Sequence, residues 1–406
     1  MTNQTIDRIF AETAYIRTGG SEAELKAAQY LRDECAKLGL SADIVPFEVD
    51  MATVKTAKLI VDGVEIPCKG YLCAGCAEVE ADFYYLSATD DYSKSLIKDK
   101  IVMIDGYLGY WMYQDLLEKG AVGFITYDGH VNYADRDIDQ RELRSYVSQG
   151  KKIPGVNINA KDAVEIINRD AKKAKIILDQ DEYKGESRNV ILDMPGEIDE
   201  WIVCTAHYDS TSLSTGAYDN MSGSIAILAI AEYFTTHKHK YGIRIIWCGS
   251  EERGLLGSKA YCAAADEETL GKIALNVNID MVGCIMGKFI ACCTSEERFA
   301  HYINYFGKEC GMVVESRDGV YSSDSTPFAD KGIPAVSFAR VTPANVATIH
   351  NSYDTLELMK ASRMAEDIDF ICAFTDRMAN AKIMPVPRSM PDKMKDQLDK
   401  YLCRKR

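Results

Sequence analysis

Apolar and polar residues follow one another in blocks that predict strands and helices in turn. Residues 201–206 (WIVCTA), 243–248 (IRIIWC) and 274–279 (ALNVNI) are short apolar runs typical of buried strands. Residues 224–234 (SIAILAIAEYF) and 356–379 instead have the length and apolar spacing of helices. This alternation predicts an α/β fold with a mixed central β-sheet flanked by helices on both faces.

Acidic residues and histidines stand at the carboxyl ends of the predicted strands and in the loops that follow. Ligand sites of open α/β sheets lie at these strand ends, so we expect the side chains to converge. Imidazole and carboxylate groups suit zinc or a neighbouring transition ion. A hydrogen-bonded histidine and a helix-capping aspartate would explain one such loop, but no structural need explains them all. The residues are His207, Asp209, Asp219, Glu251, Glu252, Asp280 and His350.

Five segments carry a family resemblance in their order and spacing. They are HYDS (207–210), YDNMSG (218–223), SEERGLLGS (250–258), NIDM (278–281) and IHNSYDT (349–355). The set resembles the co-catalytic zinc exopeptidases that include aminopeptidase Y, the leucyl aminopeptidases and glutamate carboxypeptidase II. The resemblance implies the zinc exopeptidase fold and two zinc ions per chain.

The same resemblance assigns a role to each candidate residue. Asp219 would bridge the two ions, of which one also takes His207 and Asp280 and the other takes Glu252 and His350. Glu251 would be the general base, and Asp209 would orient His207. The peptide between Asp219 and Asn220 is often cis in this family. A bridging carboxylate suits two metals about 3.5–4 Å apart, which can together activate a shared water.

The implied activity is that of a metal-dependent exopeptidase, most directly an aminopeptidase acting on peptides with a free N-terminus. Two alternatives remain open within this fold. Glutaminyl cyclases resemble the family but use one zinc ion, so metal stoichiometry separates them. Receptor-like relatives bind without catalysis, although they lose ligands or the base that this chain keeps. A carboxypeptidase would need a basic pocket, and no arginine cluster stands near the motifs.

The resemblance also implies a discontinuous domain. A capping box at Ser21 and Glu24 begins a helix that ends at Gly39, and the strand DIVPFEV follows. Residues 1–50 and 186–385 would form the exopeptidase domain, which the chain re-enters near Ser187. The insert, 51–185, contains KIVMIDG and AVGFITYDG and resembles a protease-associated domain. Residues 386–406 form a tail that either docks on a partner subunit or frays.

Net charge, apolar runs and cysteine content argue against some classes of partner and indicate a cellular location. The formal charge of −14 argues against nucleic acid and anionic membranes, which reward basic patches. The longest apolar run, IAILAIA, is too short to span a membrane. Thirteen cysteines without a visible secretory signal favour reduced thiols and a cytoplasmic location. The sequence leaves open whether the chain forms a homo-oligomer.

Two further groups are weaker candidates. Cys68, Cys73 and Cys76 lie close together in sequence, but they lack a fourth ligand, and we expect ordinary core packing. The segment VYSSDSTPF resembles the family's pocket-lining segment, with Ser325 where many relatives place histidine. Within it, Tyr321 lies just before the pair Ser323-Asp324, and we expect it to pack beneath the pocket, with donation to an oxyanion as the alternative.

Overall fold

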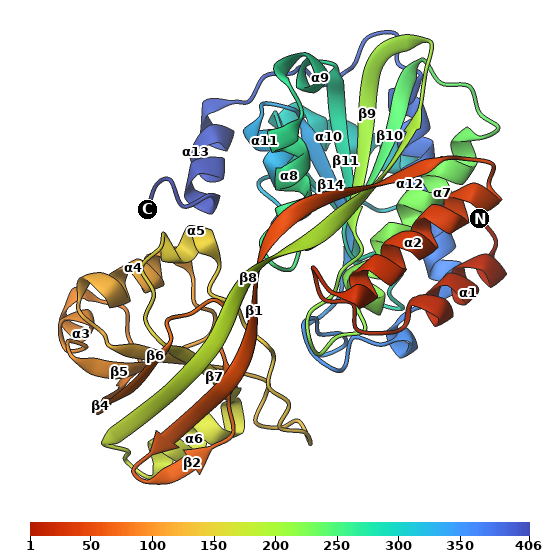
Figure 1. Cartoon of the computed structure of the whole chain (residues 1–406). Coiled ribbons are helices and arrows are strands. Elements are labelled where there is room, and N and C mark those ends of the chain that lie inside the picture. The colour runs from red at the N-terminus through yellow and green to blue at the C-terminus, as the bar shows by residue number, and fades with distance from the viewer. The chain divides into compact units, whose positions relative to one another are not determined.

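The protein divides into two compact units, which the computed structural model describes over residues 1–406. The large unit comprises residues 1–48 and 186–405, and the inserted unit comprises residues 49–185 together with Arg406. Figure 1 shows both, coloured along the chain.

The large unit is built on a mixed sheet in the order β13-β12-β14-β11-β9-β10-β8. Strand β9 runs parallel to both β10 and β11, and β11 runs parallel to β14. Strands β12 and β8 are antiparallel to β14 and β10. The strands are β8 (Lys173–Met194), β9 (Ile198–His207), β10 (Tyr241–Cys248), β11 (Ile273–Ile279), β12 (Lys288–Thr294), β13 (Glu315–Asp318) and β14 (Ala335–Val341).

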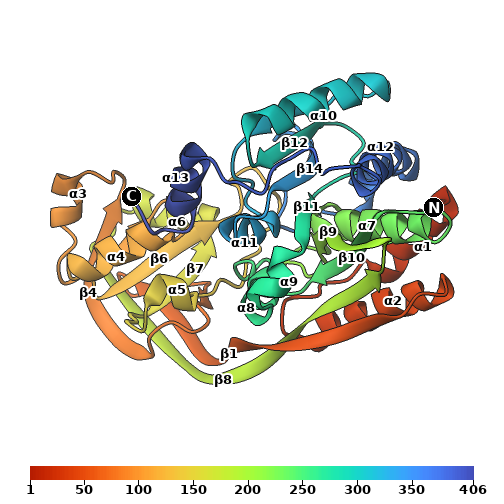
Figure 2. The ribbon, with the colours of Figure 1, turned by 90° about the horizontal axis from the view of Figure 1, so that it is seen from above.

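Helices cover both faces of this sheet, which confirms the predicted fold class (Figure 2). One face packs against α1 (Asn3–Thr13), α2 (Glu22–Lys37), α7 (Ser222–Phe234), α10 (Glu297–Glu309) and α12 (Ala361–Ala379). The other packs against α8 (Leu256–Ala264), α9 (Glu267–Gly271) and α11 (Ser325–Asp330). Helix α7 is apolar all round because it contacts the sheet as well as α1 and α12.

Strands β1 (Ala42–Val61) and β8 are much longer than the apolar runs that predicted them. They pair with each other, and each continues from one unit into the other. Along β1 most residues beyond Val49 are exposed or half-buried rather than buried. Hydrophobic pattern alone therefore predicted only the strand portions that reach a core.

The helix predicted over residues 356–379 begins later than its apolar spacing predicts. Residues 356–358 form a short 3-10 turn, η2 (Leu356–Leu358), and α12 begins at Ala361. Between them, Met359 forms a β-bridge with Cys284, and the Lys360 amide donates to the Gly283 carbonyl. These contacts hold the backbone in an extended conformation, which interrupts the helix.

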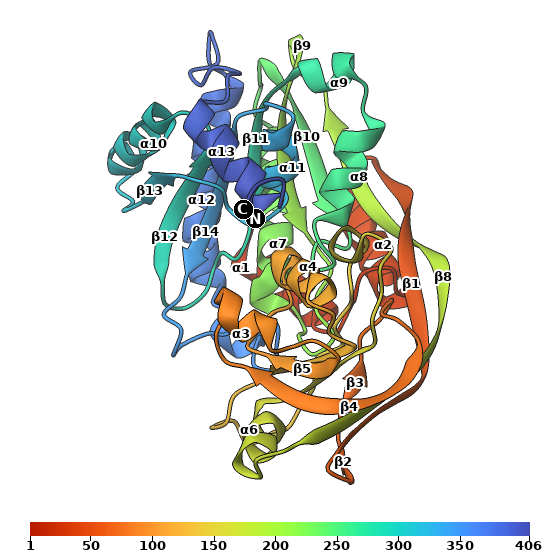
Figure 3. The same ribbon diagram turned by 90° about the vertical axis from the view of Figure 1, so that its left-hand side faces the viewer.

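The inserted unit has its own core around four parallel strands, β4 (Ala77–Leu86), β5 (Lys100–Ile104), β6 (Gly123–Asp128) and β7 (Gly155–Asn159). The Tyr71 and Phe124 rings meet edge to face at 4.9 Å in this core. Helices α4 and α6 flank the strands (Figure 3). The remaining elements are β2 (Val64–Ile66), β3 (Lys69–Gly70), α3 (Asp91–Ser95), α4 (Tyr110–Glu118), α5 (Ser145–Ser148) and α6 (Ala160–Asn168).

The tail packs on the large unit. Helix α13 (Asp392–Tyr401) buries Met394 and Leu398 against Ala329 of α11. Lys393 also forms an ion pair of 2.8 Å with Asp318. None of the helices combines the length and apolar character needed to cross a bilayer.

Candidate metal centre

Four neighbouring parallel strands direct the candidate residues toward one edge of the sheet. His207 is the last residue of β9, Glu251 and Glu252 follow β10, and Asp280 follows β11. His350 lies in the loop after β14. Because the carboxyl ends of parallel strands meet at the same edge, residues far apart in sequence gather there.

These side chains form two groups that share Asp219. His207, Asp219 and Asp280 make one group, and Asp219, Glu252 and His350 make the other. Asp219 Oδ1 lies 3.1 Å from His207 Nε2, and Asp219 Oδ2 lies 3.1 Å from His350 Nε2. Each oxygen of this carboxylate therefore faces a different group.

The donor atoms have the spacing of a metal site. His207 Nε2 lies 3.6 Å from Asp280 Oδ1, and His350 Nε2 lies 3.1 Å from Glu252 Oε2. Bonds of about 2.0–2.2 Å in a tetrahedral zinc site place neighbouring ligand atoms roughly 3.3–3.6 Å apart. Asp280 Oδ1 is also buried without a hydrogen-bond partner, a costly state that a cation would relieve. The residues present therefore fit a metal in each group.

The electrostatics of the cluster also favour added positive charge. Burial disfavours the charged form of His207, but the surrounding carboxylates, Glu251 first, raise its pKa well above the usual value. Burial likewise opposes ionisation of Asp219, but hydrogen bonds from His207 and His350 lower its pKa. The carboxylates of Asp219, Glu251, Glu252 and Asp280 thus outnumber the two imidazoles at the centre.

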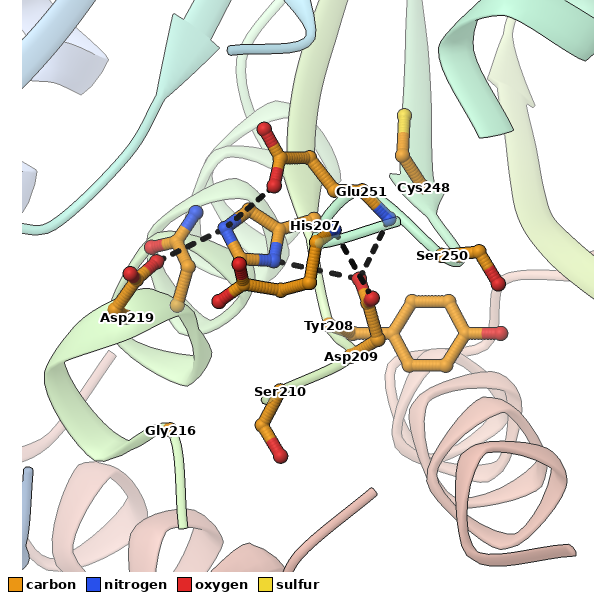
Figure 4. A network of polar contacts seen from close by, with 12 residues as sticks. His207, Tyr208, Asp209, Ser210, Gly216, Asp219, Cys248, Ser250 and Glu251 are labelled. Carbon is orange, nitrogen blue, oxygen red and sulfur yellow. Dashed lines mark hydrogen bonds and ion pairs between the residues drawn. The ribbon is translucent and has the colours of Figure 1, made fainter. Parts of the chain in front are cut away.

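Asp209 lies between His207 and Glu251, as Figure 4 shows, and also contacts Glu252. Its Oδ1 accepts from the Glu251 amide at 2.9 Å, and its Oδ2 accepts from the Glu252 amide at 3.2 Å. Oδ1 also lies 3.4 Å from His207 Nδ1. One buried carboxylate therefore binds both glutamate backbones and lies beside the imidazole.

Glu251 faces the same centre without belonging to either group. Its Oε2 lies 3.9 Å from His207 Nε2, and its side chain is 11% exposed. Burial raises the pKa of Glu251 well above the usual value, while the nearby His207 opposes that shift. Such a carboxyl group can hold a proton close to the centre.

The turn that carries Asp219, η1 (Ala217–Met221), leads directly into α7, and its Asp219–Asn220 peptide is cis. The Asn220 side chain donates to the Ile279 carbonyl at 2.9 Å and accepts from the Met281 amide at 3.0 Å. It thereby holds the residues on either side of Asp280. A Cβ at Gly223 would lie 2.3 Å from the Ile279 carbonyl oxygen, so this approach requires glycine.

The segment VYSSDSTPF faces the interior of the sheet more than the centre. Asp324 is fully buried and accepts from Ser258 Oγ at 2.5 Å, and burial raises its pKa to about 6. Ser325 Oγ shares a hydrogen bond of 2.8 Å with Ser337 Oγ. Tyr321 is partly buried, and burial, together with the charge of Asp280, raises its pKa well above the usual value.

Sequence reasoning missed several buried charged residues beside the centre. Asp354 accepts from the amides of Tyr218 and Asp219, at 2.8 and 3.1 Å. Arg17 and Glu24 come from the N-terminal segment and contact the loops that carry the candidate ligands. Asp354 lies inside the motif IHNSYDT, which is the one signal that could have marked it.

The clustered cysteines do not form a comparable group. No set of metal-ligating side chains includes Cys68, Cys73 or Cys76. Gln180 lies among them instead, accepting from the Cys73 amide at 3.1 Å. None of the thirteen cysteines takes part in a disulfide.

Comparison with known proteins relates the segment that carries the site to a peptidase family. The sequence profile of peptidase family M28 matches residues 189–375, which contain all seven candidate residues. Aminopeptidase YwaD of Bacillus subtilis is 31% identical over 190 residues, covering 42% of this chain and 40% of that protein. Leucine aminopeptidase 2 of Trichophyton rubrum is 40% identical over 96 residues, covering 23% of this chain and 19% of that protein. The matched segments thus span less than half the length of these curated relatives.

Solved structures share the fold over nearly the whole chain. BSAP, a zinc aminopeptidase from Bacillus subtilis, aligns with a TM-score of 0.77 and 23% identity, covering 97% of both chains. The aminopeptidase from Aneurinibacillus sp. strain AM-1 aligns with a TM-score of 0.76 and 21% identity, covering 95% of this chain and 96% of that one. The segment 189–375 is thus similar to peptidase family M28, and the whole chain shares the fold of these solved aminopeptidase structures.

Proposed function

We propose that this protein is a zinc aminopeptidase that holds two ions per chain and removes the N-terminal residue of peptides. The observation that carries the proposal is the pair of three-residue groups sharing Asp219, with donor atoms at metal-ligand spacing. The relatives named aminopeptidase and zinc aminopeptidase support the same activity.

Each residue has a separate task in this proposal. His207 and Asp280 would hold one ion, Glu252 and His350 would hold the other, and Asp219 would serve both. Zinc bound there would polarise the scissile carbonyl and lower the pKa of a shared water to about 7. Asp209 keeps the His207 ring and the tandem glutamates in register.

Glu251 is the proposed general base. It reaches the centre but stands outside both groups, so its carboxylate is available to take a proton from the attacking water. The same group can then pass the proton to the leaving amine. Burial, which raises the pKa of Glu251, favours the protonated intermediate state of this relay.

The proposed substrate is a peptide with a free N-terminus. Carboxylates dominate the site, and the whole chain carries a formal charge of −14. The site therefore tolerates the α-amine of a substrate's N-terminus, protonated or neutral, but would repel a substrate carboxylate. We also assign the insert of residues 51–185 to the protease-associated type, on the sequence resemblance given above.

Elemental analysis of bound metal, paired with hydrolysis of aminoacyl amides, tests the proposal. We expect two zinc ions per chain and chelator-sensitive release of free amino acids. The matched control is the same panel with acetylated amines, which an aminopeptidase should leave intact. One tightly held ion without amide hydrolysis would contradict the proposal and favour a cyclase. No metal under zinc-replete conditions would favour a non-catalytic binding protein.

A further inference from the structure

The chain between His207 and Asp219 is irregular up to Gly216 and then enters η1 at Ala217. We call residues 208–219 the ligand loop, because it begins beside one proposed ligand and ends at the one shared by both groups. Its first nine residues lie in no helix or strand, and η1 departs from helical backbone angles at Asp219 itself, so regular secondary structure does not fix the Asp219 carboxylate. Two buried side chains of opposite charge bind it instead.

Arg17 binds the carbonyl side of the ligand loop. It lies between α1 and α2, and its side chain is fully buried. Its three guanidinium nitrogens make five hydrogen bonds, all of them to backbone carbonyls. Those carbonyls belong to Thr13, Tyr15, Tyr208, Thr215 and Gly216.

The Arg17 backbone adds two more contacts to the same loop. Its amide donates to Ser210 Oγ at 3.1 Å, and its carbonyl accepts from the Ser210 amide at 3.2 Å. Tyr208, Ser210 and Gly216, which appear in Figure 4 with His207 and Asp219, are therefore all tied to one residue. Burial lowers the pKa of Arg17 to about 10, which still leaves a cation at neutral pH.

Asp354 binds the amide side of the ligand loop. Its two oxygens accept from the amides of Tyr218 and Asp219, and its carbonyl accepts from Thr215 Oγ1 at 2.9 Å. Asp354 is fully buried and follows His350 by four residues in the same loop. It therefore connects the ligand loop to the segment that carries the second histidine.

Ser214 connects the part of the ligand loop that Arg17 binds to the part that Asp354 binds. Its hydroxyl donates to Asp354 Oδ2 at 3.1 Å and accepts from the Gly216 amide at 2.7 Å. The Gly216 carbonyl in turn accepts from Arg17 Nη2 at 2.7 Å. A continuous chain of hydrogen bonds thus runs from the cation through the loop to the anion.

We infer that Arg17 and Asp354 are positioning residues that clamp the ligand loop and hold Asp219 between the two metal groups. The inference rests on the proposed function, because it concerns the affinity of the same two sites. Since Asp219 belongs to both groups, loosening the clamp weakens both ions rather than one.

The clamp predicts that loss of Arg17 weakens metal binding, whereas simple electrostatics predicts that it strengthens metal binding. Arg17 is a cation near Asp209, Asp219 and Asp354. Removing a positive charge close to a metal site would tighten the binding of a dication if charge alone mattered. Loss of the loop's hydrogen bonds instead weakens binding, because the ligands must then be ordered when the metal arrives.

Zinc affinity of the metal-free protein, measured by competition with a chromophoric chelator, tests the clamp. We expect Arg17→Met to weaken both ions at least tenfold. Arg17→Lys keeps the charge but loses the planar fork of donors, so we expect it to weaken them as well. The matched control is Arg8→Met, on the neighbouring helix, whose guanidinium bonds Tyr30 and Glu34 instead.

The absorption spectrum of the cobalt-substituted protein supplies a second readout. We expect an altered spectrum for Arg17→Met and an unchanged one for Arg8→Met, even if both variants lose thermal stability. If Arg17→Met does not fold, Ser214→Ala tests the clamp instead. This substitution removes the hydrogen bonds of Ser214 to Asp354 and to the Gly216 amide without removing a charge. We expect that variant to bind both ions several-fold more weakly.

Three results would overturn the inference in distinguishable ways. Unaltered affinities in Arg17→Met, or in Ser214→Ala where the former does not fold, would refute the clamp alone. Tighter binding in Arg17→Met would also refute it, in favour of electrostatics. An unaltered protein that binds no zinc would instead refute the proposed function, and the clamp with it.

Discussion

Asp219 is the residue on which both groups depend. Its oxygens lie 3.1 Å from the Nε2 atoms of His207 and His350, which otherwise belong to separate groups. Asp280 and Glu252 complete one group each. Substitution of the shared residue should therefore remove both metal ions, whereas substitution of a residue that belongs to one group should remove only one.

The first prediction follows from that difference. Asp219→Ala should lose both zinc ions, whereas Asp280→Ala and His350→Ala should each retain one tightly held ion. Elemental analysis after gel filtration in limiting zinc measures the number of zinc ions that each variant retains. Retention of two ions by Asp219→Ala would show that Asp219 does not bridge them. Equal losses in all three variants would mean that the two groups do not bind independently.

Glu251 and Glu252 are adjacent but differ in role. Glu251→Gln should lower kcat by about 10²–10⁴, the usual contribution of a general base, because the amide cannot accept the proton. Zinc content should stay unchanged, since Glu251 lies outside both groups. Glu252→Gln is the matched neighbour and should lose metal. Turnover retained by Glu251→Gln would rule out the assigned base.

At the scale of elements, the N-terminus of α2 contributes to the centre in an unexpected way. Ser21 caps the helix through the Glu24 amide at 3.1 Å, as the capping-box pattern predicts. The Glu24 side chain does not complete the box at Ser21 but accepts from Ser187 Oγ at 2.6 Å and Ser250 Oγ at 3.2 Å. Ser250 directly precedes Glu251, so α2 supports the glutamate segment.

The burial of Glu24 predicts a pH-dependent stability. Burial, aided by the charge of Asp209, raises its pKa from 4.5 to about 7, although Ser187 and Arg188 oppose the shift. The folded state therefore binds the proton more tightly than the unfolded state. The resulting stability is full below about pH 4.5 and is lost as pH rises through about 7. Its upper limit is about 3 kcal/mol.

Glu24→Gln should remove this contribution. Urea unfolding between pH 5 and 8 measures the free energy of unfolding for both proteins. We expect the unaltered protein to lose stability relative to Glu24→Gln as pH rises across this range. Parallel curves would show that Glu24 has an ordinary pKa despite its burial.

The sheet explains why strand patterns were so informative at this scale. His207 and Asp280 each follow an apolar run directly, and the tandem glutamates follow one after two residues, so sequence alone locates them at strand ends. Elements shaped by other contacts were less predictable. The start of α12 at Ala361 depends on backbone pairing with residues 283–285, which no local pattern reveals.

At the scale of the whole molecule, thirteen cysteines are distributed through both units without a disulfide. Most are buried, and burial raises the pKa of thiols such as Cys204, Cys248 and Cys293. Only Cys76 and Cys310 are exposed. Reactivity toward a thiol reagent should therefore be confined to few positions in the folded protein.

Thiol titration checks this prediction. The folded protein should show a fast phase limited to Cys76 and Cys310, because buried thiols ionise poorly and are screened from the reagent. Unfolding without reductant should expose all thirteen. A prereduced sample is the control. Fewer than thirteen thiols in the sample that was not reduced would reveal a disulfide.

The sequence by itself determined the mixed α/β fold and the identity of the residues that could hold a metal. Both follow from local information, because apolar runs mark buried strands and polar residues at their ends mark the edge where ligands bind. The tertiary structure decided what supports those residues. Asp354 contacts Asp219 across 135 residues, and Arg17 contacts Gly216 across 199. Such partners meet only once the chain has folded, since a buried charge finds its hydrogen bonds wherever packing brings complementary backbone groups.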